Sequence, residues 1–93
     1  MSTVVVKVPT DNAKIAEVHG WIVTVKKKTN GSGAKRKIFV SDIDQAVQNR
    51  AGTYWILSLS KRSGQRIVKN ILYITAVDRR GRVIDRLVRK CKP

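Results

Sequence analysis

Acidic residues are scarce in this chain. Six Asp and Glu residues stand against 20 Lys and Arg residues in 93, so the formal net charge is +14 at pH 7. A single small domain cannot separate so many like charges, and their repulsion opposes the compact state unless a polyanion neutralises them. The scarcity also leaves few carboxylates from which an enzyme could build an acid–base pair. We therefore expect a binding protein without catalytic residues rather than an enzyme.

Cysteine and histidine are rarer still. Cys91 and His19 are the only members of their types in the sequence. This excludes a disulfide framework within the chain and the usual Cys/His patterns of zinc sites. We expect neither a metal nor a cofactor. We interpret Cys91 as a packed or incidental thiol and His19 as a capping or surface residue.

Long hydrophobic runs are also missing. The longest, residues 71–77, is far too short to span a bilayer, and the first residues lack the layout of a signal peptide. We therefore expect a cytoplasmic protein with no membrane partner. Hydrophobic residues still make up 42% of the chain, which favours a folded globule over a disordered basic tail. The length is that of one domain, residues 1–93.

Several segments have the composition of β-strands. β-Branched residues fill 3–8, alternation marks 53–60, and 71–77 is apolar on both faces, as is typical of a central strand. Residues 21–26 and 37–40 flank a turn at Asn30-Gly31-Ser32-Gly33, and we expect them to form a hairpin. A second turn is expected at Arg79-Arg80-Gly81.

Three other segments favour short helices. Residues 10–19 place Ile15 and Val18 on one face and end at Gly20, although a continuous strand from Ala16 is the alternative. Residues 42–51 follow a capping-box-like pattern, Ser41 with Asp44, and end at Gly52.

The last of these segments, residues 82–92, has apolar residues at helical spacing, whereas 65–70 suits either a helix or a strand. The expected fold class is α+β, a single domain with a mainly antiparallel sheet and two or three short helices.

A basic arm surrounds the expected hairpin tip. It consists of six cations with no acid among them, namely Lys26, Lys27, Lys28, Lys35, Arg36 and Lys37. Such an arm can follow a phosphate backbone. The alternative is an edge hairpin that lysines protect against aggregation. Two facing triplets favour binding over protection.

A second phosphate-binding surface is expected towards the end of the chain. Arginine can fork onto phosphate and stack on bases, and the expected members are Arg79, Arg80, Arg82, Arg86 and Arg89. The alternative is an ordinary solvated helix face with an Asp85–Arg89 pair. A third, weaker cluster consists of Lys61, Arg62 and Arg66.

Five aromatic residues complete the candidate site. Proteins that bind single strands stack bases on aromatic side chains set among cations. We take Trp21 and Tyr54 as the candidate stacking residues. The other three, Phe39, Trp55 and Tyr73, are expected in the core.

Val4-Val5-Val6, the 71–77 strand and Arg79-Arg80-Gly81-Arg82 give the chain a resemblance to small basic archaeal nucleic-acid-binding proteins. The ThermoDBP-like single-strand binders are one family of this kind. The resemblance covers architecture alone. It implies an antiparallel sheet flanked by helices and binding of single-stranded nucleic acid.

The sequence as a whole predicts non-catalytic binding of nucleic acid, mainly through phosphates and with weak sequence preference. Single-stranded DNA or RNA is favoured over duplex because the aromatic residues lie on expected strands. One alternative is a ribonucleoprotein, chromatin or viral packaging component that binds duplex. Another is a small metal-independent ribonuclease that uses His19. A thermophile-like charged surface fits less well because such surfaces balance the two signs. Whether the chain forms a homodimer is left open.

Overall fold

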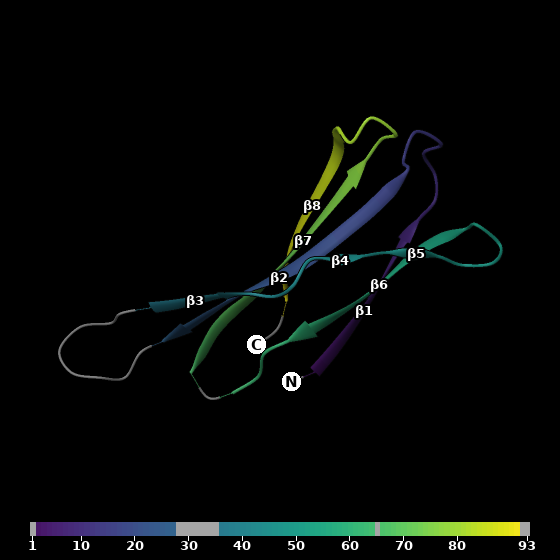
Figure 1. The fold of residues 1–93 in the computed structure, drawn as a ribbon. Helices are drawn as coiled ribbons and strands as arrows, with labels where there is room; N and C mark the ends of the chain where they lie inside the picture. Colours follow the sequence, from purple (N-terminus) through teal and green to yellow (C-terminus); the bar gives the residue numbers. More distant parts are fainter. Residues whose placement is uncertain (1, 28–35, 65, 92–93) are drawn as a thin grey trace.

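The regular elements of the protein are β-strands throughout (Figure 1). The computed structural model describes residues 2–27, 36–64 and 66–91. In chain order the strands are β1 (Ser2–Pro9), β2 (Glu17–Lys27), β3 (Arg36–Val40), β4 (Asp44–Gln45), β5 (Val47–Gln48), β6 (Tyr54–Lys61), β7 (Ile67–Val77) and β8 (Val83–Cys91). The expected α+β class is therefore wrong, because the described residues form an all-β domain without helices. None of them belongs to a helix long and apolar enough to cross a membrane.

Two antiparallel sheets make up the fold. Sheet A has the strand order β1-β6-β5, and sheet B has the order β3-β2-β7-β8, with β4 also paired to β2. The chain crosses from sheet B to sheet A at Ala46, which is buried and donates its N–H to the Val18 carbonyl at 2.7 Å. The sheets are thus joined along one side, whereas β1 and β8 each form an edge of their sheet.

The core lies between the two sheets. Alternate residues of β1, β2, β6 and β7 point into it, and its buried members are Val18, Ile22, Ala46, Trp55, Leu57, Leu59, Leu72, Ile74 and Ala76. Gly20 lets the sheets approach, because a Cβ there would lie 3.1 Å from Leu57 Cδ1 and 3.3 Å from the Tyr73 carbonyl oxygen. Gly20 therefore has a packing role within a strand instead of ending a helix.

The helix expected over 10–19 does not form. Glu17 to His19 begin β2, and Ala16 donates its N–H to the Val77 carbonyl at 2.8 Å, which continues the β2–β7 pairing. The alternative of a strand from about Ala16 is the correct one. Val18 alternates with Gly20 and Ile22 towards the core, so strand periodicity overrides the thin apolar stripe of the helix.

The helix expected over 42–51 is replaced by β4 and β5. Of the three apolar residues that would form one face of this helix, Ala46 is buried, but Ile43 and Val47 are 66% and 71% exposed. The Ser41 hydroxyl accepts a hydrogen bond from the Ile22 N–H at 2.8 Å and so caps no helix. In this segment β4 pairs with β2 of sheet B and β5 pairs with β6 of sheet A, which provides partners for its backbone groups. Gly52, expected to end this helix, has a positive φ of 70° and lies in the turn before β6.

The helix expected over 82–92 is also wrong, because Val83–Cys91 form β8. Its apolar residues fit helical spacing, but β7 offers a full row of backbone groups with which an extended chain can pair. Residues 67–70 belong to the start of β7, which resolves the ambiguity of 65–70 in favour of a strand.

The other strand predictions are confirmed. Residues 3–8, 21–26, 37–40, 53–60 and 71–77 lie within β1, β2, β3, β6 and β7, apart from Thr53, which precedes β6. β7 is central between β2 and β8, and β2 pairs with β3 as a hairpin. Gly81, with a φ of 77°, forms the expected turn after β7. The expected turn at residues 30–33 lies outside the described residues.

Candidate nucleic-acid interface

The described part of the basic arm is a two-stranded ribbon at the end of β2 and the start of β3. Antiparallel pairing places Lys26 opposite Lys37 and Lys27 opposite Arg36. All four side chains are exposed. Like charges directly opposite one another destabilise a sheet, so this basic ribbon (Lys26, Lys27, Arg36 and Lys37) carries a local repulsion that an anion would remove. Outside the described residues lie the other two cations of the expected arm, Lys28 and Lys35.

An aromatic ring lies beside the basic ribbon. Phe39 is half-buried on β3, with the Arg62 guanidinium carbon 4.3 Å and the Lys37 Nζ 5.1 Å from its ring centroid. Both distances are in the range of cation–π contacts. The expectation that Phe39 lies in the core is wrong, because it is not part of the buried cluster between the sheets. Arg62, from the weaker predicted cluster, thereby joins the ribbon.

A shallow groove runs beneath this contact. It consists of two adjoining hollows of about 280 and 110 Å³, both of which Thr24, Phe39 and Arg62 line. Serine hydroxyls surround it, with Ser41 and Ser60 around the larger hollow and Ser63 at the smaller. Hydroxyl groups beside cations are the usual partners of phosphate and sugar oxygens.

A buried polar contact holds the floor of the groove. Asn70 is fully buried on β7, and its Oδ1 accepts a hydrogen bond from the Thr24 hydroxyl of β2. The Asn70 Nδ2 donates to the Arg62 carbonyl at 3.2 Å. Because Arg62 follows β6, this contact ties the end of sheet A to sheet B and fixes the backbone of the residue above Phe39.

Backbone contacts also fix the positions of two further cations, Arg66 and Lys61. The Lys27 N–H donates to the Arg66 carbonyl at 2.8 Å, so Arg66 lies beside the basic ribbon. Lys61 ends β6 next to Arg62, opposite Ser2 of β1. The predicted cluster of Lys61, Arg62 and Arg66 is thus close in space to the ribbon rather than separate from it.

The outer face of sheet B carries a second feature, a stacked aromatic pair. Trp21 and Tyr73 are cross-strand partners on β2 and β7, with ring centroids 5.6 Å apart and an angle of 4° between the ring planes. Both are half-buried and point away from the core. Tyr73 was expected in the core, and that expectation is wrong. Its alternation with Leu72 and Ile74, which do face the core, was the signal in the sequence.

Cations flank this aromatic pair on the same face. β8 pairs Lys90 with Ile71 and Arg86 with Thr75, one row to either side of Tyr73. Residues that pair across antiparallel strands share a face, so both cations lie on the face of the stack. We call this surface, with Trp21, Tyr73, Arg86 and Lys90, the aromatic face. The sequence prediction did not include Tyr73 or Lys90.

Tyr54 lies on the other side of the molecule. It begins β6 in sheet A and is 42% exposed, whereas its neighbour Trp55 is buried in the core. The prediction that Trp55 is buried and Tyr54 exposed is confirmed. Because Tyr54 lies on the outer face of sheet A and Trp21 on the outer face of sheet B, the two candidate stacking residues do not form one platform.

The arginines of the predicted second surface are divided among three places. Arg79, Arg80 and Arg82 lie in the β7–β8 turn, at the opposite end of sheet B from the basic ribbon (Figure 1). Arg86 lies on the aromatic face. Arg89 pairs with Leu72 and thus lies on the opposite side of β8. A single helix face of arginines does not exist.

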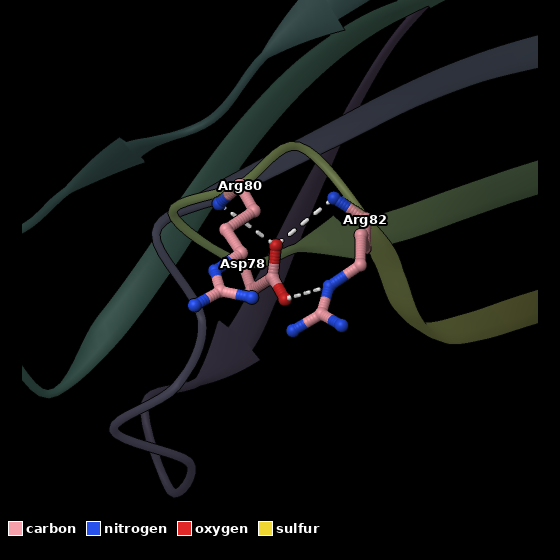
Figure 2. Close-up of polar contacts among 3 residues, drawn as sticks. All are labelled: Asp78, Arg80 and Arg82. Atoms are coloured by element: carbon pink, nitrogen blue, oxygen red, sulfur yellow. Dashed lines mark hydrogen bonds and ion pairs between the residues drawn. The ribbon is translucent and has the colours of Figure 1, made fainter.

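Asp78 organises the β7–β8 turn (Figure 2). Its Oδ1 accepts hydrogen bonds from the N–H groups of Arg82 and Arg80, both at 2.9 Å, and its Oδ2 accepts one from Arg82 Nε at 3.0 Å. The backbone hydrogen bond from Arg82 is the main cause that lowers the pKa of Asp78 below its ordinary value, and burial opposes it. Arg82 is therefore partly neutralised and structural, while Arg79 and Arg80 remain exposed.

The comparisons with known proteins give no match. No model of a protein family fits the chain, and neither the curated proteins nor the solved structures compared with it are significantly similar. Within the described residues, no group of three or more His, Cys, Asp or Glu side chains is placed to hold a metal ion.

Proposed function

We propose that the protein binds nucleic acid without catalysis, mainly through phosphates, and favours single strands over duplex. The observation that carries the proposal is the pairing of Lys26 with Lys37 and of Lys27 with Arg36. A ribbon that served only the fold would gain from acids at two of these four positions. Phosphates along the ribbon would remove the repulsion and release counterions.

The aromatic groups support the preference for single strands. An unpaired base can extend the Trp21–Tyr73 stack or lie against Phe39, whereas bases within a duplex already stack on one another. Lys27 and Arg36 alternate onto the same side of sheet B as Trp21, so this pair of the ribbon continues the aromatic face, whereas Lys26 and Lys37 alternate onto the opposite side, that of Phe39. A strand could thus contact the Lys27–Arg36 pair and the aromatic face with little bending.

Fluorescence-anisotropy titrations at several salt concentrations test the proposal. Single-stranded DNA, single-stranded RNA and duplex DNA of equal length are compared. We expect single strands to bind tightest, with affinity falling steeply as salt rises. Absence of binding to all three at low salt would refute the proposal. Tighter binding to duplex would refute the single-strand preference and favour a chromatin or packaging component.

A matched pair of variants tests the ribbon itself. K27S/R36S removes one lysine and one arginine from the ribbon, and K7S/R50S removes the same charges from exposed positions elsewhere. We expect the ribbon variant to lose affinity and its logarithmic salt slope to fall by about 0.7 for each phosphate of a single strand that it no longer neutralises. The control should stay close to wild type. Equal losses in both would mean that net charge acts without a site.

A ribonuclease is the second candidate, favoured by one contact. His19 Nε2 lies 2.9 Å from Glu17 Oε2 on the aromatic face, in the row of Thr75 and Arg86. A histidine, a carboxylate and a cation together are able to move a proton and stabilise a phosphate. Incubation with labelled RNA decides between the two functions, because cleavage that H19A abolishes would establish the enzyme.

A cytoplasmic location belongs to the binding proposal, since unpaired RNA and DNA are found there.

A further inference from the structure

β8 is a long strand whose outer edge is open. Among the described strands it pairs only with β7, and its nine residues contain no proline. Four apolar side chains on it are between 38% and 57% exposed, namely Val83, Ile84, Leu87 and Val88. An open edge of this length and composition is a template for pairing with another chain unless it is blunted.

We propose that a second copy of this chain pairs with it through β8, antiparallel, with Leu87 opposite the second copy's Leu87. The two-fold axis then passes through the Leu87 pair, perpendicular to sheet B. The residues from Asp85 to Arg89 gain partners in regular alternation, whereas Val83 and Ile84 lie beyond the register shift between β7 and β8 at Ala76 and Val77. Two copies of sheet B become one continuous sheet.

The charges on β8 select this register. Asp85 lies opposite the second copy's Arg89, and Arg89 lies opposite the second copy's Asp85. Within one chain these residues are four positions apart on an extended strand, about 13 Å, and the described residues give Asp85 no ion pair of its own. The pairing between copies thus supplies two opposite-charge pairs that the single chain cannot make.

Neighbouring registers are worse. Residues that pair must lie on the same face of the joined sheet. The two-fold axis can therefore shift along β8 only by whole residues. An axis at Arg86 would place two arginines opposite each other, and an axis at Val88 would place Arg86 opposite the second copy's Lys90. Like charges opposite one another are unfavourable.

The other open edges offer less to a second copy. β3 carries Arg36 and Lys37 and would meet the same charges in its partner. β1 has no acidic residue and ends in Pro9, so pairing through it yields no ion pair. The proposal concerns the free protein and does not depend on nucleic acid. It adds that both aromatic faces lie on the same side of the joined sheet.

Charge exchange across the interface tests the register. Sedimentation equilibrium at one salt concentration compares wild type with D85R, R89D and the double variant D85R/R89D. D85R raises the net charge and R89D lowers it, yet each should weaken the dimer by about tenfold or more, since each replaces both opposite-charge pairs with like-charge pairs. The double variant has the wild-type net charge and should restore dimerisation to within about threefold. Opposite effects of the two single changes, or a double variant that stays monomeric, would overturn the proposal.

Disulfide trapping in a Cys91→Ser background provides an independent readout. Leu87→Cys places two thiols opposite each other, with Cα atoms within the roughly 4.4–6.8 Å that a disulfide spans. Val88→Cys is the control. Position 88 of one copy lies two residues along the strand from position 88 of the other, so the two Cα atoms are about 8 Å apart, too far for a disulfide. We expect a covalent dimer with Leu87→Cys alone. A dimer with Val88→Cys alone, or a wild-type protein that is monomeric at every concentration up to about a millimolar, contradicts the pairing.

Discussion

Lys26 and Lys37 face each other across the β2–β3 pair, one step from the facing pair of Lys27 and Arg36. Each contact is unfavourable in the free protein. Under the proposed function, stability and binding therefore make opposite demands on these positions. A ribbon whose charges served only solubility would show no such opposition.

Reversing one charge of the ribbon should stabilise the fold and weaken binding. Lys26→Glu places an acid opposite Lys37, and we expect the free energy of unfolding to rise by about 0.2–1 kcal/mol. Lys7→Glu lowers the net charge equally but lies opposite Ile56, so its gain should be smaller. Urea denaturation and anisotropy titrations measure the two effects. If both variants lose the same affinity, the ribbon is not a site.

Trp21 should report binding by its fluorescence. Bases that extend the Trp21–Tyr73 stack should quench Trp21, whereas Trp55 is buried in the core. Quenching by an oligonucleotide should persist in Trp55→Phe and vanish in Trp21→Phe. Trp21→Ala should weaken binding by about 1–3 kcal/mol for one stacked base. Quenching retained without Trp21 would place the ligand elsewhere.

The buried Asn70 should matter to both stability and the groove. Asn70→Ala leaves the Thr24 hydroxyl and the Arg62 carbonyl without their partners, and we expect a loss of about 1–3 kcal/mol in the free energy of unfolding. Thr24→Val removes the first hydrogen bond alone and should cost a similar amount. Affinity should fall further in Asn70→Ala, because only that change frees the backbone of Arg62. Equal affinities in the two variants would show that the tether does not position Arg62.

Asp78 should make the β7–β8 turn sensitive to acid. Its pKa is lowered in the folded protein, mainly by the hydrogen bond from the Arg82 N–H, from an ordinary value of 3.8. The stabilising contribution is therefore present above pH 3.8 and is lost as the pH falls through the lower, folded-state pKa. Asp78→Asn should be less stable than wild type at pH 7, and the difference should vanish in strong acid. Thermal unfolding between neutral and acid pH measures this, with Asp42→Asn as the exposed control.

The strands were predictable where local pattern and global packing agree. Val4 and its neighbours, the alternation around Trp55 and the apolar run of 71–77 each indicate a strand on their own. The helix predictions were wrong in segments whose apolar residues fit both helical and strand spacing. Val83, Ile84, Leu87 and Val88 match helical spacing, but the open edge of β7 decides for a strand. Tertiary pairing overrides weak local preference in such segments.

The candidate site was likewise predictable from the sequence only in part. The cations of the basic ribbon were apparent from their density along the chain, because adjacent residues remain adjacent in a hairpin. The Arg62 contact with Phe39, the stacking of Trp21 on Tyr73 and the dispersal of Arg79, Arg86 and Arg89 were not, since each depends on which strands become neighbours.

The sequence by itself determined that this protein is strongly basic, that its single cysteine and single histidine cannot form the usual Cys/His zinc patterns, and that cations cluster at residues 26–28 and 35–37. These properties depend on residue counts and on contacts between near neighbours. Only the tertiary structure decided that the described residues form an all-β fold, that Arg79, Arg86 and Arg89 lie apart instead of on one helix face, and that β8 presents an open edge. Strand order and register arise from long-range pairing, and a pattern read along one segment carries no information about its partner.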